Sequence, residues 1–163
     1  MRILLIANYE DKGGGISVQV RLLCGFLRND GHCCDIISTK GLIVKRVKAV
    51  FALLSKGRDY DVFHIHACSD RGFLPAILGI SIGRLLQKRI VLSFHGGGAE
   101  DFFKRKKNLV KHYLNRTSAN IVLSGFTGRV FDQYGIPYTV IPNILESDDS
   151  TFRARTEIEY HFR

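Results

Sequence analysis

Residues 1–38 read MRILLIANYEDKGGGISVQVRLLCGFLRNDGHCCDIIS and decide the fold class. The short apolar run Arg2–Ala7 predicts a buried strand. Apolar residues then recur at helical spacing over Ile16–Leu27, and Gly31 is typical of the residue that ends a helix. Cys33–Ser38 predicts a second strand. A strand, a helix and a strand in this order indicate a parallel α/β fold.

The same alternation continues to residue 141, with a change from short apolar runs to helical spacing at each step. This pattern predicts an α/β, doubly wound, Rossmann-like parallel sheet of about six strands, with 3-2-1-4-5-6 as the expected strand order. In such sheets ligands bind at the carboxyl ends of the strands. The further predicted strands are Val62–His66, Ile90–Phe94, Ile121–Leu123 and Tyr138–Ile141, and the further predicted helices cover 43–54, 71–87, 101–116 and 124–134.

Length and charge predict one domain and a tail. The 163 residues are 45% apolar, which suits one soluble domain with an ordinary core. No apolar run has the length of a membrane-spanning helix, and the first residues lack a signal-peptide cleavage site, so we expect a cytoplasmic location. The net charge is +11 over residues 1–145 and −2 over 146–163. We therefore predict a domain over 1–145 and an acidic linker or tail over 146–163.

Three consecutive glycines, Gly13, Gly14 and Gly15, separate the first strand from the first helix. Glycines allow a ligand to approach the backbone closely, and a helix N-terminus favours phosphate. The alternative is a flexible turn. The loop is not GxGxxG, and no acidic residue clearly ends the second strand, which argues against a nicotinamide or flavin dehydrogenase.

Two histidines lie in the third predicted strand. His64 and His66 are two residues apart, so both project to one side of the strand. His66, at the end of the strand, should face the ligand cleft, whereas His64 should be packed. No carboxylate or cysteine cluster accompanies them, and the four cysteines lack CxxC spacing, so we expect no metal.

The fourth strand is followed by His95 and by Gly96, Gly97 and Gly98. This arrangement predicts an exposed imidazole beside an open backbone, able to act on a substrate hydroxyl or to hydrogen-bond a sugar. An esterase would also need GxSxG, and the serine at 124 has no glycine two residues before it. Ser124 is well placed to cap a helix and, in the same cleft, is also a candidate substrate contact.

Two basic segments, residues 44–58 and 102–116, contain no acidic residue. They could be solvated faces, anionic membrane-binding surfaces or nucleic-acid-binding surfaces. No nucleic-acid-binding motif accompanies them, so we expect no nucleic-acid partner and favour the inner face of a membrane. Aromatic residues such as Phe51 and Phe102 are interleaved. The cations assigned to this surface are Lys45, Arg46, Lys48, Lys104, Arg105, Lys106, Lys107 and Lys111.

Taken together and in order, these motifs resemble the N-terminal domain of glycosyltransferase family four over residues 1–145. Each motif is weakly specific, but the order and spacing of all of them are fairly specific. They are the loop Gly13–Gly15, Gly31-His32, Asp61–His66, Ser93–Gly96, Ile121–Ser124 and Val140–Asn143.

The resemblance implies the acceptor-side lobe of a two-domain GT-B enzyme that transfers a sugar with retention from a nucleoside diphosphate donor, without a metal or another cofactor. It implies that His95 is the catalytic residue, near the transferred sugar and the acceptor hydroxyl. Gly13, Gly14 and Gly15 would approach the donor diphosphate. His66, Gly96, Gly97 and Ser124 would line the substrate cleft.

Family members carry a second, donor-binding domain with an acidic E-x7-E motif, which would lie beyond Asn143, and only about twenty residues follow. We therefore expect this chain to be inactive without a donor-binding domain or a partner subunit. Polysaccharide or lipid-linked glycan acceptors are favoured by the basic surface. Two alternatives remain open: a non-catalytic acceptor- or membrane-binding subunit that recruits a catalytic partner, and half of a sugar-nucleotide epimerase.

Overall fold

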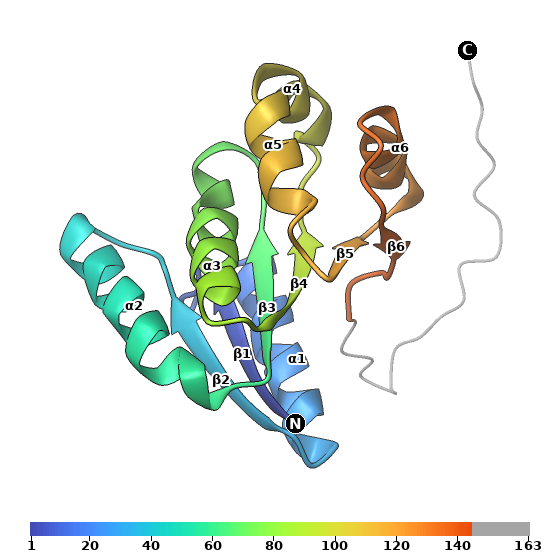
Figure 1. Ribbon diagram of the computed structural model, residues 1–163. Helices are drawn as coiled ribbons and strands as arrows, with labels where there is room; N and C mark the ends of the chain where they lie inside the picture. The colour runs from blue at the N-terminus through green and yellow to red at the C-terminus, as the bar shows by residue number, and fades with distance from the viewer. Residues whose placement is uncertain (145–163) are drawn as a thin grey trace, which may run out of the picture.

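The computed structural model describes residues 1–144, and strands and helices alternate along them (Figure 1). The strands are β1 (Arg2–Ala7), β2 (Cys33–Ser38), β3 (Val62–Ala67), β4 (Arg89–Phe94), β5 (Ala119–Val122) and β6 (Thr139–Val140). The helices are α1 (Gly15–Asn29), α2 (Ile43–Lys56), α3 (Leu74–Leu85), α4 (Ala99–Arg105), α5 (Lys107–Leu114) and α6 (Gly125–Gln133), with 3-10 turns η1 (Gly57–Asp59) and η2 (Asp70–Phe73).

All six strands pair in parallel in one sheet, in the order β2-β1-β3-β4-β5-β6. The predicted fold class is confirmed, but the expected order 3-2-1-4-5-6 is wrong. That order would have made β3 an edge strand. β3 instead has Phe63, Ile65, His66 and Ala67 buried, whereas β2 exposes alternate residues, including Asp35. The strand with a polar side therefore occupies the edge, and the buried strand occupies the centre.

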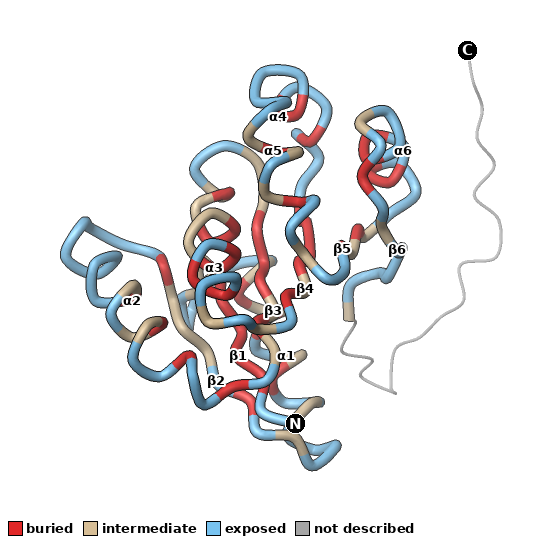
Figure 2. The backbone as a smooth tube through the Cα atoms, in the orientation of Figure 1, coloured by how far each residue is buried: buried red, intermediate tan, exposed pale blue. Residues whose placement is uncertain are grey.

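Helices cover the two faces of the sheet unequally. α1 alone packs on one face, over a small core that includes Leu5, Val20 and Cys24. The other five helices lie on the opposite face, over a larger aromatic core (Figures 1 and 2). α3 lies closest to the strands, because a Cβ at Gly79 would stand only 2.8 Å from Ile65. Among residues 1–144, α1 is therefore the only helix on the face of β3, β4 and β5 that points away from the other five helices.

Local sequence signals explain most element boundaries. Gly31 has φ 79° and follows α1, and the amide of His32 donates to Leu27 O at 2.9 Å, as predicted for a glycine-terminated helix. Pro75 lies in the first turn of α3, where its missing N–H costs nothing. The predicted helix 101–116 is wrong as a single element. It is two helices, α4 and α5, which break at Lys106, where φ is −124°.

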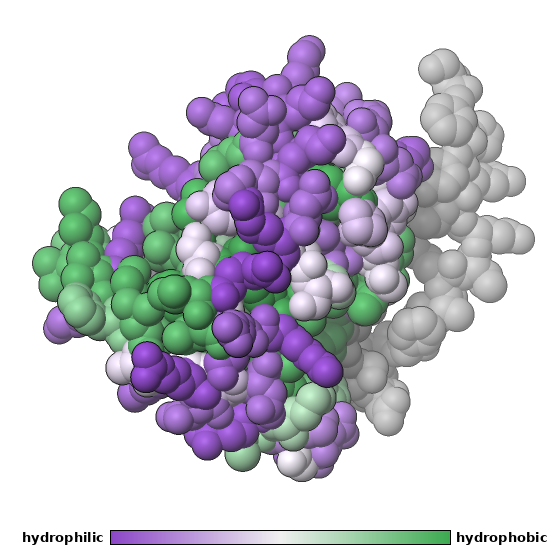
Figure 3. Space-filling view, viewed as in Figure 1, coloured by the Kyte–Doolittle hydropathy of each residue, from purple (hydrophilic) through white to green (hydrophobic). Residues whose placement is uncertain are grey.

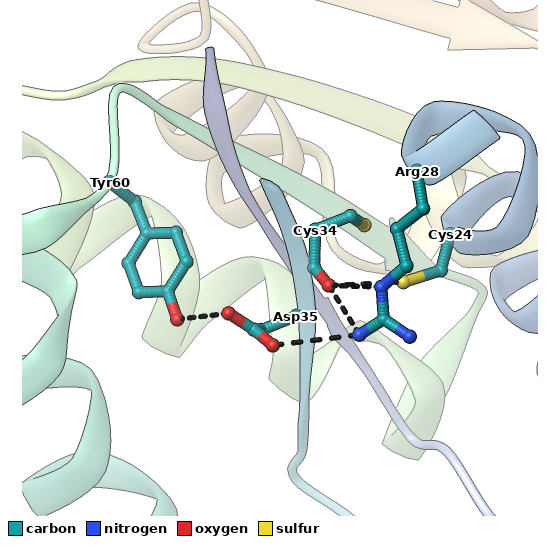
Figure 4. A network of polar contacts seen from close by, with 5 residues as sticks. All are labelled: Cys24, Arg28, Cys34, Asp35 and Tyr60. Carbon is teal, nitrogen blue, oxygen red and sulfur yellow. Dashed lines mark hydrogen bonds and ion pairs between the residues drawn. The ribbon is translucent and has the colours of Figure 1, made fainter. Parts of the chain in front are cut away.

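The amino edge of the sheet carries a polar network between α1, β2 and the turn before β3 (Figure 4). The Tyr60 hydroxyl donates to Asp35 Oδ2 at 2.7 Å, and Arg28 Nη2 lies 3.6 Å from Asp35 Oδ1. The Arg28 guanidinium also donates to the Cys34 carbonyl oxygen at 2.6 and 2.9 Å. The network ties the edge strand to its neighbours.

None of the helices described within residues 1–144 is both long enough and apolar enough to cross a bilayer. The predicted acidic linker, residues 146–163, lies outside the described residues.

Candidate functional site

Two histidines meet where β3 and β4 reach the carboxyl edge of the sheet. The strands pair with His66 opposite Ser93, and the amide of His95 donates to Ala67 O at 2.7 Å. This register directs both imidazoles to the α1 side of the sheet, where His66 Nδ1 lies 2.9 Å from His95 Nε2. One pleat deeper, His64 Nε2 lies 2.8 Å from Ser93 Oγ and the His64 ring stacks on that of His66 at 4.6 Å between centroids.

Burial keeps these three imidazoles uncharged. Removal from water lowers the pKa of His64 to about 4 and that of His95 to about 4, and it lowers the pKa of His66 well below its ordinary value of 6.5. The neighbouring imidazoles add to the effect at His64 and His66. At neutral pH the cluster therefore supplies hydrogen-bond donors and acceptors rather than positive charge.

The hydrogen bond between these two neutral histidines uses one nitrogen of each ring, so the second nitrogen of each ring lies outside it. His66 is only 3% exposed, and its Nε2 has no hydrogen-bond partner. Ser69 Oγ, just beyond the end of β3, is also buried without a partner. An unpaired buried polar atom is costly, so a further hydrogen-bonding group would be stabilising at His66 Nε2 and at Ser69 Oγ. A hydroxyl group suits His66 Nε2 in either tautomer, because it both donates and accepts.

A pocket of about 200 Å³ opens above this cluster. Its polar floor consists of the three histidines and Ser93, and its walls are apolar side chains from α1, β5 and the segment after β6. The Gln19 side-chain amide holds that segment in place. Gln19 Nε2 donates to Ile144 O at 2.8 Å, and Ile144 N donates to Gln19 Oε1 at 2.7 Å. The pocket is therefore built from residues that lie more than one hundred positions apart.

The three glycines after β1 have different surroundings. Gly13 is enclosed, since its amide donates to Glu10 O at 2.9 Å and an added Cβ would lie 2.8 Å from Ser17 Cβ. Gly14 and Gly15 have no atom within 4 Å of an added Cβ. They stand at the N-terminus of α1, whose first amides lack partners within the helix. Gly13 shapes the loop, and Gly14 and Gly15 present an open backbone.

The glycines after β4 divide in the same way. Gly96 has φ 139°, which only glycine adopts readily, and an added Cβ at Gly97 meets no atom within 4 Å. The expectation of an exposed imidazole at His95 is wrong, because that residue is 6% exposed. The backbone turns inward after β4, and His95 reaches the pocket from below. Ser124 is exposed and caps α6, with Oγ accepting from Thr127 N at 3.4 Å.

A sequence-family model described as Glycosyltransferase Family 4 matches residues 40–148, which is more than half of the chain. The chain belongs to glycosyltransferase family 4. The matched region of this family 4 domain contains His66, His95 and Ser124, and the glycine loop Gly13–Gly15 lies before it.

The search of solved structures gives a distant similarity. The chain is similar to a protein from a study of the 2-deoxyribosyltransferase of the psychrotolerant bacterium Bacillus psychrosaccharolyticus, with 13% identity and a TM-score of 0.49. The match covers 88% of this chain and 99% of that one. No curated protein sequence matches the family 4 domain.

Three polar residues of the site are not evident from the sequence alone. Ser93 could have been found, since it lies two residues before His95 and so shares its face of the sheet. Gln19 and Ser69 carry no comparable signal, because their roles depend on contacts made in the folded chain. Within residues 1–144, no three His, Cys, Asp or Glu side chains gather in a way that could hold a metal ion.

The cations assigned to a membrane surface are solvent-facing, except for the half-buried Lys111. The two basic segments nevertheless differ. In α4 the interleaved aromatic residues Phe102 and Phe103 are 2% and 0% exposed, and Arg105 pairs with Asp70 at 3.0 Å. In α2, Phe51 is 67% exposed. Of the two basic segments, α2 is therefore the one that combines exposed cations with large exposed apolar side chains.

Proposed function

We propose that this family 4 domain is the acceptor-side lobe of a retaining, nucleotide-sugar-dependent glycosyltransferase. The observation that carries the proposal is the buried His66–His95 pair, which lines a pocket at the carboxyl edge of the sheet. Uncharged histidines at the floor of an apolar-walled pocket suit a sugar, which offers hydroxyl groups and apolar C–H faces.

His95 is the proposed catalytic residue. Its imidazole is neutral at physiological pH, so it accepts a hydrogen bond from the acceptor hydroxyl, or donates one to the transferred sugar, without first losing a proton. His66 holds the His95 ring through the 2.9 Å contact. Ser124, at the start of α6, is the proposed outer contact to the same substrate.

The donor diphosphate is proposed to meet backbone rather than metal. Gly14, Gly15 and Gly97 are open to an approaching ligand, and Gly96 makes the turn that presents Gly97. Backbone N–H groups at the N-terminus of α1 would stabilise the leaving-group charge. Gly13 serves the same site by shaping the loop that ends at Gly14.

A donor-binding lobe, in the same polypeptide or in a partner subunit, is proposed to close over this edge. The site described here offers neutral imidazoles and backbone amides, which suit an acceptor and one side of a diphosphate. Polysaccharide or lipid-linked glycans are the proposed acceptors.

The proposal is tested by following histidine imidazole signals by NMR while the chain is titrated with ligands. Glycan acceptors should shift the signals of His66 and His95, and the exposed His112 provides an internal control. Nucleotide sugars should shift the amide signals of Gly14 and Gly15 weakly. Shifts at His112 alone, or none at the pocket, would remove the acceptor site.

A transfer assay tests the need for a second lobe. The chain alone should give no turnover with a nucleotide sugar and a glycan, and addition of a donor-binding lobe should restore it. Under those restored conditions, His95→Ala should reduce kcat by about 100-fold or more. Turnover by the chain alone would contradict the second lobe. A sugar-nucleotide product formed without any acceptor would favour the epimerase alternative.

A further inference from the structure

Helix α2 presents an apolar surface to solvent that the folding of the domain does not explain. Leu42, Ile43, Val44, Val47 and Phe51 are 82%, 77%, 66%, 47% and 67% exposed. Figure 3 shows apolar side chains gathered over α2, at the left of the molecule, and Figure 2 shows the same helix as largely exposed. We call these five residues the α2 apolar patch.

The patch is a separate face of the helix, distinct from the one packed on the domain. α2 packs through Ala49 and Leu53, which are 5% and 0% exposed. Phe51 precedes Leu53 by two residues, which places it roughly 200° away around the helix. Val44, Val47 and Phe51 follow one another at helical spacing and form a continuous outward stripe. α2 is thus apolar on both sides.

Leu42 strengthens this interpretation. It occupies the N-cap position of α2, where its side chain makes no capping hydrogen bond. Leucine is among the poorest N-cap residues, and at 82% exposure it gains nothing from burial in the domain. Its presence there is explained by contact with something outside residues 1–144.

The charges beside the patch indicate what that contact is. Residues 41–58 contain five cations and no acidic residue. Lys45 and Lys48 flank the apolar stripe and line a groove of about 530 Å³. The groove also contains Lys40, Glu10 and Asp11, and Lys40 Nζ pairs with Glu10 Oε2 at 2.7 Å. The charged residues of α2 itself are all cations. An apolar stripe on a helix whose charges are all positive matches acyl chains below anionic headgroups.

We propose that α2 docks the domain on an anionic bilayer. The helix lies in the plane of the interface, with Val44, Val47 and Phe51 among the acyl chains and Lys45 and Lys48 at the level of the lipid phosphates. Its 14 residues are too few to span the membrane. Membrane docking is a function separate from sugar transfer, and its test measures binding rather than activity.

The experiment is vesicle flotation of the full chain. Vesicles of phosphatidylcholine with about 30 mol% phosphatidylglycerol are compared with pure phosphatidylcholine, at about 50 and 500 mM NaCl. The chain should float with the anionic vesicles at low salt and at least about 10-fold less with neutral vesicles or at high salt. Equal binding to both vesicle types, or no binding at low salt, would overturn the proposal.

Matched variants locate the contact. Phe51→Ser should weaken flotation by about 10-fold or more, and Phe126→Ser, which alters an aromatic residue 51% exposed on α6, should have no effect. Lys45→Ala/Lys48→Ala should weaken it by about 25-fold, and Lys104→Ala/Lys107→Ala by far less. Circular dichroism checks that each variant is folded.

Other occupants of the patch would give different results. If a second copy of the chain covered it, analytical ultracentrifugation would show a dimer that Phe51→Ser dissociates, while flotation would be unchanged. If charge alone held the chain, the two lysine pairs would act equally and Phe51→Ser would have no effect. Either result would refute docking through α2. Histidine variants of the pocket should not alter flotation, so the two proposals fail separately.

Discussion

The two edges of the sheet differ in how far their polar side chains are paired. At the amino edge, Tyr60, Asp35 and Arg28 satisfy one another within one network. At the carboxyl edge, His66 Nε2 and Ser69 Oγ are the two buried side-chain polar atoms without partners among residues 1–144. The same parallel sheet therefore has one edge whose polar network is closed among its own residues and one edge with two buried polar atoms left unpaired.

This difference follows from the direction of the chain in parallel sheets. Loops at the carboxyl edge lead into helix N-termini, whose free amides face the edge. The loops at the amino edge follow helix ends, and here they are short and closed by hydrogen bonds such as Asp61 N to Arg2 O at 2.8 Å. Function thus accumulates at one edge, and the predictions below test how separate the two edges are.

Lowering the pH should produce the largest loss of stability, through the buried histidines at the carboxyl edge. The folded-state pKa of His95 is about 4, below its ordinary value of 6.5, so the folded chain binds fewer protons than the unfolded chain between these pH values. The contribution is complete above pH 6.5 and is lost as the pH falls to 4. Urea unfolding should show a loss of roughly 3 kcal/mol from His95, with more from His64.

A histidine variant separates this effect from general acid unfolding. His95→Asn should flatten the dependence of the unfolding free energy on pH between 6.5 and 4, whereas His112→Asn, at an exposed position, should leave it unchanged. If the unfolding free energies of the His95→Asn protein and the wild type fell in parallel as the pH is lowered, the conclusion that His95 is a buried, neutral imidazole would be wrong.

The second-largest effect is expected in the glycine loop after β1, and it tests whether every glycine of that loop is open to a ligand. Gly13→Ala should destabilise the fold by about 1–3 kcal/mol, because the new Cβ would lie 2.8 Å from Ser17 Cβ and 3.0 Å from Glu10 O. Gly14→Ala should change stability by less than about 0.5 kcal/mol, since nothing lies within 4 Å. Thermal unfolding measures both.

The same glycine pair tests ligand binding. Gly14→Ala should remain folded and yet weaken the NMR shifts caused by a nucleotide sugar, because the methyl group occupies the approach to the backbone. Equal thermal stability of the two variants would show that the loop rearranges freely around Gly13.

The sequence predicts the elements better than their assembly. Strand and helix periods locate β1, β2 and α1 because these depend on local burial patterns. The strand order depends on which strand is buried on both faces, and the two histidines of β3 hide that burial in the sequence. The break at Lys106 has no proline or glycine to announce it.

The site shows the same division. His66 and His95 could be predicted because each ends a strand, and strand ends meet in parallel sheets. The 2.9 Å contact between them could not be predicted, because it depends on the β3–β4 register. Nor could the link between Gln19 and Ile144, which joins residues 125 positions apart. The burial of His95 was missed for the same reason.

At the amino edge, a smaller effect is expected. Tyr60→Phe removes the hydrogen bond to Asp35 and should cost about 1 kcal/mol in urea unfolding at pH 7. Burial and Asp35 raise the pKa of Tyr60 to about 12 from 10, so its contribution is complete below pH 10 and is lost toward pH 12. Acceptor binding should be unchanged. A shift at His66 in this variant would show that the two edges are coupled.

The smallest effect is expected at Ser124, where the cap and the site coincide. Its Oγ accepts from Thr127 N at a long 3.4 Å, so Ser124→Ala should cost only about 0.5 kcal/mol. Ser124→Asp should restore the cap and stability, because a carboxylate also accepts from that amide and favours a helix N-terminus. Urea unfolding of both variants is compared with glycan titration by NMR. If Ser124 only caps α6, glycan binding will follow stability and will recover in Ser124→Asp. If Ser124 also contacts the acceptor, Ser124→Ala will weaken glycan binding and Ser124→Asp will not restore it. The second result would add the Ser124 hydroxyl to His66 Nε2 and Ser69 Oγ as polar groups that a ligand satisfies, and would extend the incomplete edge to the end of β5.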